Sequence, residues 1–378
     1  MPHSAPPVHP PVPPASGMLE STSTSERPWP HRCLLGLQGL EPAELRELLL
    51  TARGFAEVST RSVKKVPTLR GKVVANLFFE DSTRTRLSFT LAAQRLSADI
   101  IDLSSSGSSV SKGESVTDTA LNIEAMGVDA MVVRHKASGA AQQVAQAVRC
   151  AVINAGDGKH EHPTQGLLDI YTLAEAHKRL DGFDLSGLRV AIVGDIVSSR
   201  VARSNIAGLT ALGAEVICVG PPTLAPRSLE ALGARVAHDF DAVVDGAMGE
   251  VHSVNMLRIQ FERHGDSGST LGAPGRRVED SGRSSGGGSG GNGGGGGGGG
   301  SPAFPSIREY AQCFSLTSER ARRLAPGCIV MHPGPMNRGI EIADEVADGP
   351  RSVIFRQVSC GLAVRMAVLY LCVRASEQ

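Results

Sequence analysis

The residues with the clearest chemical pattern lie at positions 78–89, where hydroxyl and guanidinium groups follow an apolar run. Residues 73–79 are almost wholly apolar and predict a buried strand, and a helical pattern begins at Ser82 and Thr83. Free backbone N–H groups at a helix start, with hydroxyls and the guanidinium of Arg84, suit a small phosphorylated dianion. The stretch therefore predicts a phosphate site. The alternative is that the two hydroxyls only cap a helix and that the arginine is solvated.

Further polar clusters follow predicted strands or begin predicted helices. They are Arg134 with His135, His162 with Gln165, Arg200, Arg258 with Gln260, and residues 332–335. Ligands of open α/β sheets bind beyond the carboxyl ends of the strands and at helix N-termini, so we expect these clusters to meet in one site. No serine or cysteine nucleophile beside a base stands out, and no carboxylate pair does. The pattern predicts direct transfer between two bound substrates.

Two other kinds of site are disfavoured by spacing. His160, Glu161 and His162 are of metal-ligand types, but adjacent side chains point apart and no fourth ligand has matching spacing, so we expect no metal. A dinucleotide site is disfavoured because no G-x-G-x-x-G follows Gly194 and because Arg200 heads the next helix. We therefore expect no cofactor.

The elements that must position these residues alternate between strands and helices. Strands are predicted at 73–79, 98–103, 129–133, 152–156, 188–195, 215–220, 242–244 and 328–331, and helices at 41–49, 82–96, 115–126, 163–180, 309–324 and 361–373. Pro163 suits a first helical position, which puts His162 just before that helix. The predicted fold class is α/β, with two doubly wound parallel-sheet domains joined by a long helix.

Composition limits the class of protein. The 378 residues allow two domains. The chain has equal numbers of basic and acidic residues, 38 each, which excludes a strong overall electrostatic field that would attract nucleic acid or a membrane surface. Seven scattered cysteines without a C-x-x-C pair predict reduced core residues of a cytoplasmic protein. We find no apolar run of about 18 residues that would predict a membrane span.

Three stretches are of low complexity. Residues 1–31, rich in Pro, Ser and Thr, predict a disordered arm, within which Met18 is an alternative start. Residues 265–301 predict a disordered glycine-rich insertion. The serine-rich run 104–112 predicts a mobile loop, which is either a lid that carries Lys112 to an anion or a solvated linker.

Two motifs, residues 79–89 and His162-Pro163-Thr164-Gln165, resemble the signatures of the carbamoyltransferases. Residues 167–169 and 256–260 are similar to the aspartate carbamoyltransferase catalytic chains, and residues 332–335 lack the cysteine expected of an ornithine enzyme. The resemblance covers residues 32–373 except the glycine tract. It implies transfer of the carbamoyl group of carbamoyl phosphate to the α-amino group of L-aspartate through a tetrahedral intermediate. The products would be N-carbamoyl-L-aspartate, a pyrimidine precursor, and phosphate.

The same resemblance implies a role for each motif residue. The phosphate would be held by Ser82, Thr83, Arg84 and Thr85. The carbamoyl oxygen would contact Arg134, His162 and Thr85, and the carbamoyl nitrogen would contact Gln165 and the backbone of Gly334 and Pro335. The aspartate carboxylates would be bound by Arg200 and Arg258, with Gln260 assisting. The loop residues Ser108 and Lys112 would act in trans from the neighbouring subunit of a homotrimer, Lys112 as a catalytic and aspartate-binding residue.

The resemblance also divides the chain. Residues 32–177 would form the carbamoyl-phosphate-binding domain, residues 178–355 the aspartate-binding domain, and residues 356–378 a C-terminal helix that packs back on the first domain. Regulatory chains or dihydroorotase are partners implied at the family level only. Arg84 and Arg86 point about 200° apart on a helix, so we expect Arg86 to form a structural ion pair, with Glu80 or Asp81.

Two alternatives stay open from the sequence. One is a transcarbamylase for another amine, such as ornithine or a diamine, although a cationic side chain should be rejected by a pocket that holds Arg200 and Arg258. The other is an inactive scaffold paralogue. Every catalytic position carries a usable residue, which counts against this second alternative. Assays of amine specificity and of turnover distinguish these alternatives.

Overall fold

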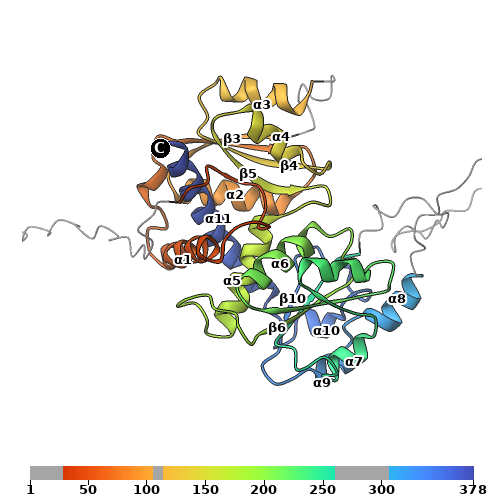
Figure 1. The fold of residues 1–378 in the computed structure, drawn as a ribbon. Coiled ribbons are helices and arrows are strands. Elements are labelled where there is room, and N and C mark those ends of the chain that lie inside the picture. Colours follow the sequence, from red (N-terminus) through yellow and green to blue (C-terminus); the bar gives the residue numbers. More distant parts are fainter. Residues whose placement is uncertain (1–28, 105–113, 260–305) are drawn as a thin grey trace, which may run out of the picture.

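The computed structural model describes residues 29–104, 114–259 and 306–378, which form two five-stranded sheets with helices around them (Figure 1). All strand pairs within both sheets are parallel. The predicted α/β class with two parallel-sheet domains is confirmed. Ser108, Lys112, Gln260, residues 1–28 of the predicted arm and the predicted insertion lie outside the described residues.

The first sheet has the strand order β1-β5-β4-β2-β3. Its strands are β1 (Cys33–Leu34), β2 (Val73–Phe78), β3 (Asp99–Ser104), β4 (Ala130–His135) and β5 (Ala151–Asp157). The helices of this half are α1 (Pro42–Val58), α2 (Thr83–Arg95), α3 (Val116–Glu124) and α4 (Ala140–Ala147). In Figure 1, α3 and α4 lie on one face of the sheet, and α1 and α2 lie on the other.

The second sheet has the order β10-β9-β6-β7-β8. Its strands are β6 (Arg189–Val193), β7 (Glu215–Val219), β8 (Arg235–Ala237), β9 (Ser253–Met256) and β10 (Ile329–Met331). The remaining helices are α5 (Pro163–Ala176), α6 (Arg200–Ala211), α7 (Phe240–Val244), α8 (Ile307–Phe314), α9 (Ser318–Arg323), α10 (Asp344–Ala347) and α11 (Ile354–Ser376). Helix α5 carries the chain from β5 towards the second sheet.

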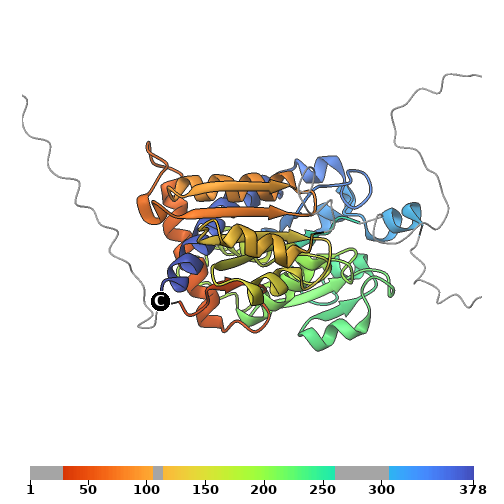
Figure 2. The same cartoon turned by 90° about the horizontal axis from the view of Figure 1, so that it is seen from above.

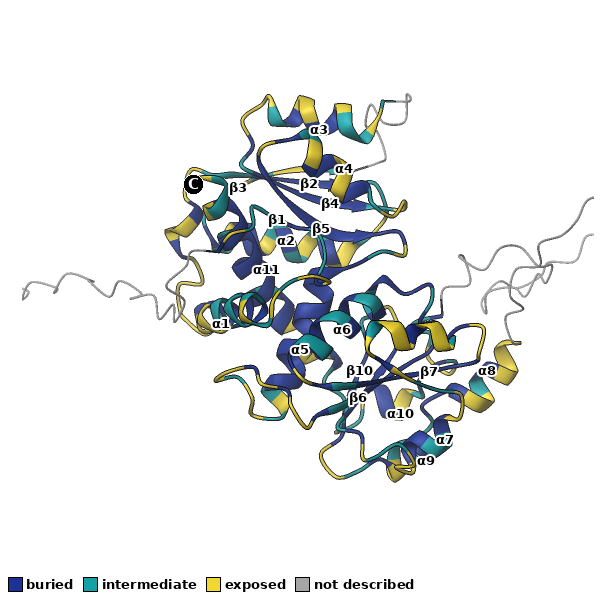
Figure 3. Ribbon diagram, viewed as in Figure 1, coloured by how far each residue is buried: buried dark blue, intermediate teal, exposed yellow. Residues whose placement is uncertain are grey.

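The inner strands β2, β4, β5, β6 and β7 are buried along almost their whole length because helices cover both faces of the sheets. Val74 packs into one buried cluster and its neighbour Ala75 into another, as expected for side chains that alternate across a strand. The larger cluster joins the inner faces of both sheets through helices α5, α6 and α11. Figure 3 shows α5 almost wholly in the dark blue of buried residues, whereas α6 and α11 combine buried with less buried residues. A shared helical layer therefore holds the two sheets together.

Helix α11 is the long apolar helix of this layer. Its 23 residues are long and apolar enough to cross a membrane, but 67% of the apolar window is buried inside the fold. It packs along α1, α2 and α5, and its blue ribbon lies beside the orange α1 in Figure 2. A core helix explains its composition. The helix begins at Ile354, earlier than the predicted residue 361.

Three other predictions were wrong in detail. Residues 242–244 form part of helix α7 and no strand, because the Asp239 side chain accepts a hydrogen bond from Ala242 N (3.0 Å) and starts a helix there. The single helix expected over residues 309–324 is two helices, because Leu316 pairs with Ile342 between them. Trp29 belongs to the predicted disordered arm, yet its side chain is 4% exposed in the core, so the folded structure includes the end of that segment.

Candidate active site

A cavity of about 870 Å³ is lined by residues that follow strands of both sheets. Every predicted site residue in the described ranges lines it: Ser82, Thr83, Arg84, Thr85, Arg134, His162, Gln165, Arg200, Arg258, Gly334 and Pro335. The predicted clusters therefore meet in one place, as parallel strands that end at a common edge require. His135, which was noted beside Arg134, is absent from the lining.

The charge of the lining is strongly positive. Its cationic side chains are Arg84, Arg134, Lys136, Arg200, Arg258 and Arg365, whereas its carboxylates are Glu80 and Asp81. Six positive and two negative groups leave an excess of four positive charges over the lining. Because the whole chain has no net charge, this local excess is a property of the cavity and suits anionic ligands.

The corner between β2 and α2 has the form of an anion site. Ser82 is the N-cap residue of α2, but its side chain makes no capping hydrogen bond. The Ser82 hydroxyl therefore does not cap α2, which contradicts the alternative that this hydroxyl only caps the helix. The first N–H groups of α2 and the positive end of the helix dipole meet the cavity beside this hydroxyl.

Arg84 lies against the turn that follows β10. A Cβ atom on Gly334 would come within 2.5 Å of the Arg84 Nη1 atom, and Gly334 has a φ of +62°. Only glycine allows this close approach without strain. Partial burial and the nearby charge of Arg258 lower the pKa of Arg84. Two guanidinium groups that repel each other across a cavity favour a bound anion between them.

Glu80 joins the two halves of the site. Its carboxylate pairs with Arg134 Nη2 at 2.9 Å and with Arg200 Nη2 at 2.5 Å. Arg200 starts α6 in the second half, while Glu80 and Arg134 belong to the first. The predicted pairing of Arg86 with Glu80 is therefore wrong, and no ion pair of Arg86 is found within residues 29–104, 114–259 and 306–378.

Gly156 lets the two arginines approach the end of β5. Its φ is +111°, and a Cβ atom there would lie 3.0 Å from both Arg134 Nη1 and Arg200 Nε. Arg134 Nη1 also donates to the Ala155 carbonyl oxygen at 3.0 Å. Both guanidinium groups thus rest on the backbone of β5, which holds them at one side of the cavity.

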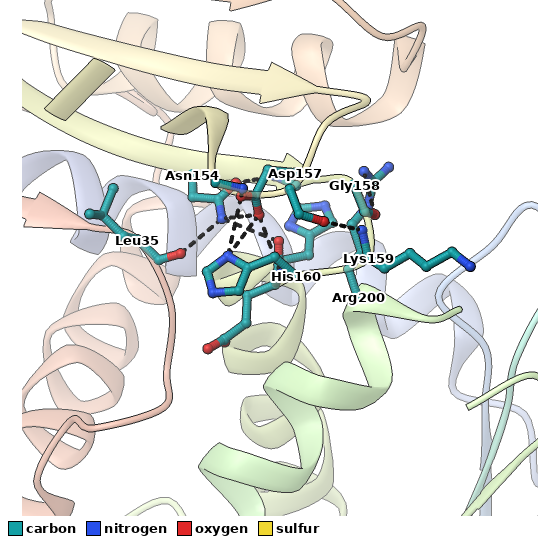
Figure 4. A network of polar contacts seen from close by, with 12 residues as sticks. Leu35, Asn154, Asp157, Gly158, Lys159, His160 and Arg200 are labelled. Carbon is teal, nitrogen blue, oxygen red and sulfur yellow. Dashed lines mark hydrogen bonds and ion pairs between the residues drawn. The ribbon is translucent and has the colours of Figure 1, made fainter. Parts of the chain in front are cut away.

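The loop between β5 and α5 is braced by its own polar groups (Figure 4). Asn154 Nδ2 donates to the Leu35 carbonyl oxygen at 2.8 Å and to Asp157 Oδ1 at 2.7 Å. The His160 ring contacts the same Asp157 carboxylate at 3.2 Å. His160 is therefore part of the brace. The loop delivers His162 to the start of α5.

His162 is a buried, neutral imidazole in this cationic cavity. Burial, followed by the charges of Arg134 and Arg200, holds the pKa of His162 well below its ordinary value. Its backbone N–H donates to Ser204 Oγ at 3.0 Å, and this hydroxyl donates to Glu161 Oε2 at 2.7 Å. The backbone at His162 is thus fixed in place, and the neutral ring can donate one hydrogen bond without adding charge.

Comparison with known proteins identifies the family. Residues 32–175 match the aspartate/ornithine carbamoyltransferase, carbamoyl-P binding domain, and residues 300–372 match the aspartate/ornithine carbamoyltransferase, Asp/Orn binding domain. The chain belongs to the aspartate/ornithine carbamoyltransferase family. The aspartate carbamoyltransferase catalytic subunit of Halothermothrix orenii is 49% identical over 337 residues, 89% of this chain and 94% of that protein. The subunit of the same name from Salinispora tropica is 50% identical over 343 residues, 90% of this chain and 97% of that protein.

A solved structure also matches the fold. It is aspartate transcarbamoylase from Trypanosoma cruzi in complex with N-(phosphonacetyl)-L-aspartic acid, with a TM-score of 0.71 and 24% sequence identity. The match covers 90% of this chain and 96% of that one. At this identity the likeness concerns the arrangement of the elements alone.

The turn after β10 completes the site of this carbamoyltransferase family member. His332 Nδ1 accepts a hydrogen bond from Gly334 N at 2.7 Å, and Nε2 lies 3.2 Å from Glu341 Oε1. The ring of His332 and the Glu341 carboxylate are both fully buried. Since Nδ1 accepts, the ring proton is on Nε2 and faces the carboxylate. The turn that carries Gly334 and Pro335 into the cavity is therefore rigid.

Several lining residues are not predicted from the sequence, and Arg365 on α11 is the most informative of them. Its Nη1 atom donates to Ser88 Oγ at 2.9 Å, and its guanidinium lies 5.3 Å from the centre of the Phe89 ring. Burial lowers the pKa of Arg365 to about 10. A lone arginine inside the apolar run 361–373 was a usable signal, because a buried charge in a core helix needs a partner or a ligand.

Proposed function

We propose that this chain is an aspartate carbamoyltransferase catalytic subunit. It transfers the carbamoyl group of carbamoyl phosphate to the α-amino group of L-aspartate. The observation that carries the proposal is the cavity, where the start of α2 and a Ser82 hydroxyl that does not cap it share the lining with arginines of the second half. The names of the two relatives that are about half identical support aspartate as the amine substrate.

The excess positive charge of the cavity supports the choice of substrates. Carbamoyl phosphate is a dianion and aspartate carries two carboxylates, so together they balance most of the lining charge. Arg200 and Arg258 would bind the two carboxylates of aspartate, with Gln260 assisting, because a guanidinium matches a carboxylate with two parallel hydrogen bonds. The cationic side chain of ornithine would be repelled by the same arginines.

The proposed reaction is a direct attack. The neutral α-amine forms a bond to the carbamoyl carbon, and the carbonyl oxygen takes up the negative charge of a tetrahedral intermediate. Arg134, His162 and Thr85 would stabilise that oxygen, and each such donor is worth about 10²–10³ in rate. The C–O bond to phosphate then breaks, and the leaving phosphate, held at the start of α2, accepts the amine proton.

We also propose a homotrimer, in which Ser108 and Lys112 reach the site of a neighbouring subunit. Apolar side chains exposed on the two helices α2 and α11, which both contribute to the cavity lining, support a covering subunit: Leu87 and Leu91 on α2, and Phe355 and Val358 on α11, which are 58%, 41%, 72% and 60% exposed. Leu87 and Leu91 lie one helical turn apart, so they form one face. The seven free cysteines support the proposal of a cytoplasmic protein.

A colorimetric assay of carbamoylaspartate tests the function. We expect turnover by the wild-type chain, a loss of about 10²-fold or more in Arg84→Ala, and a raised KM for aspartate in Arg258→Ala. Arg86→Ala is the matched control, because Arg86 lies on the same helix and outside the cavity lining, and it should stay within about threefold of wild type. Carbamoylation of ornithine instead of aspartate, or intact trimers without turnover, would overturn the proposal.

A further inference from the structure

Asp169 is a buried carboxylate of α5 that lies behind the cavity wall and outside the cavity lining. Four side-chain amides donate to it, from Gln165 at 2.9 Å, Asn205 at 2.8 Å, Asn255 at 3.3 Å and Gln357 at 2.7 Å. They come from α5, α6, β9 and α11, so one carboxylate ties elements of both halves together.

The hydrogen bonds decide which end of each amide faces Asp169. An ionised carboxylate only accepts hydrogen bonds, and it offers about four acceptor positions. Four N–H donors fill them, so each amide must turn its nitrogen towards the carboxylate. Burial raises the pKa of Asp169, and the four amide donors oppose that rise.

The two oxygens of the carboxylate serve different partners. Oδ1 accepts from Gln165 and Gln357, which both line the cavity. Oδ2 accepts from Asn205 and Asn255, which are absent from the lining. A substitution on the Oδ2 side therefore changes the support of Asp169 without changing a cavity group.

Gln165 Nε2 donates to Asp169, which turns the oxygen Oε1 of the same amide away from Asp169, and Gln165 lines the cavity. The Gln357 amide is oriented in the same way, and its Oε1 accepts from His332 N at 3.0 Å. The chain of hydrogen bonds thus continues from Asp169 to the turn that carries Gly334. An oxygen that points into the cavity can accept from an N–H donor of a ligand but cannot donate to one.

We propose that Asp169 is a positioning residue that aims the Gln165 oxygen into the cavity, so that the site selects a carbamoyl group over acyl groups without N–H donors. The inference rests on the proposed function for the identity of the group selected. A buried acceptor left unpaired by the wrong ligand costs binding free energy, which provides the selection.

The test compares two stable phosphonates of nearly equal shape. Phosphonoacetamide carries an NH2 group where 2-oxopropylphosphonate carries a methyl group, so only the first can donate to Gln165. We expect the wild-type chain to bind phosphonoacetamide about tenfold more tightly by titration calorimetry. Asp169→Ala and Gln165→Ala should each reduce that preference to about twofold or less, while binding of inorganic phosphate shows that the α2 site persists.

A double-mutant cycle separates positioning from general stability. If Asp169 acts through Gln165, adding Asp169→Ala to Gln165→Ala changes the amide preference no further. Asn205→Ala is the matched control, which removes one partner on the Oδ2 side and should keep the wild-type preference. A folded Asp169→Ala variant with the full preference, or additive effects on the preference, would overturn the inference.

A wild-type structure with phosphonoacetamide decides the matter if Asp169→Ala does not fold. The Gln165 oxygen should accept from the amide nitrogen while Gln165 still donates to Asp169, and a Gln165 side chain turned away from Asp169 would count against the proposal. Binding preference and turnover are separate measurements. A chain that prefers the amide but makes no carbamoylaspartate contradicts the proposed function alone, whereas turnover without the preference contradicts this inference alone.

Discussion

His162 shows how burial sets the chemistry of a single side chain. The imidazole lies among three arginines, and its Nδ1 atom has no hydrogen-bond partner among the described residues. A protonated ring would add a positive charge to an already cationic, buried place, so the neutral form dominates. The residue can therefore donate to a developing oxyanion throughout the physiological pH range without changing its charge.

The depressed pKa of His162 predicts how stability depends on pH. In the unfolded chain the ring binds a proton below its ordinary pKa of about 6.5, whereas the folded chain does not. Lowering the pH below this value therefore destabilises the fold, by up to about 1.4 kcal/mol per pH unit for one histidine. Denaturant unfolding of wild type and His162→Gln between about pH 7.5 and about pH 5 checks this. Equal slopes in the two chains would contradict the assignment.

Gly334 allows a second prediction at a single residue. Gly334→Ala places a methyl group against the Arg84 guanidinium and should raise the KM for carbamoyl phosphate by about tenfold or more. Gly339→Ala is the control, because Gly339 also has a positive φ of +78° but no atom within 4 Å of the added Cβ. Both variants carry the backbone strain, so a similar KM in the two would show that contact with Arg84 is unimportant.

Capping residues decide where the short helices of the second half begin. Asp239 accepts from Ala242 N at 3.0 Å and Thr317 accepts from Arg320 N at 3.2 Å. Neither α7 nor α9 is long enough to be stable alone, so the cap and the packing against neighbours define it. The apolar run 242–244 suited a strand by composition, but its local hydrogen bonds favour a helix.

Removing the Thr317 cap of helix α9 should have a measurable effect on the free energy of unfolding. Thr317→Ala leaves an N–H group of α9 without its partner and should lower the free energy of unfolding by about 1 kcal/mol. Thr317→Ser keeps the hydroxyl and should lie within about 0.5 kcal/mol of wild type. Chemical denaturation measures both variants, and equal losses would show that the methyl group, rather than the hydroxyl, supports the helix. Carbamoylaspartate synthesis should be retained in both.

At the level of the molecule, the two halves are joined by an apolar helical layer and by polar contacts around the cavity. Glu80 links Arg134 of the first half with Arg200 of the second, and Asp169 links α5 with β9 and α11. The positive groups of the cavity thus belong to both halves. A site assembled in this way depends on the relative position of the halves, which no single element determines.

Mixed oligomers test the proposed contribution of a neighbouring subunit. Arg84→Ala and Lys112→Ala chains should each be nearly inactive alone. When they are dissociated and reassembled together, a mixed trimer regains one intact site, formed by the cavity of the Lys112→Ala chain and the Lys112 of the other chain. Activity recovered on mixing, with native mass spectrometry as the measure of assembly, supports action in trans. Mixed trimers without recovered activity would place Lys112 in the site of its own chain.

The sequence by itself was sufficient for features that depend on local pattern. The strand before residue 80, the helix after Ser82 and the position of His162 before Pro163 all follow from periodicity and helix-start signals within a few residues. The site residues predicted from the sequence motifs line one cavity, because parallel strands end at a common edge of the sheet. Local sequence pattern and fold class together were therefore enough to predict these elements and these residues of the cavity lining.

Only the tertiary structure decided how those residues are paired. Glu80 was expected to pair within its own helix region but binds two arginines far along the chain, and Arg365 and Asp169 reach the site region from helices of the central layer. Leu87 and Leu91, part of the apolar pattern of α2, lie exposed rather than in the core. Ion pairs and amide contacts depend on distances across the fold, and periodicity carries no information about those distances.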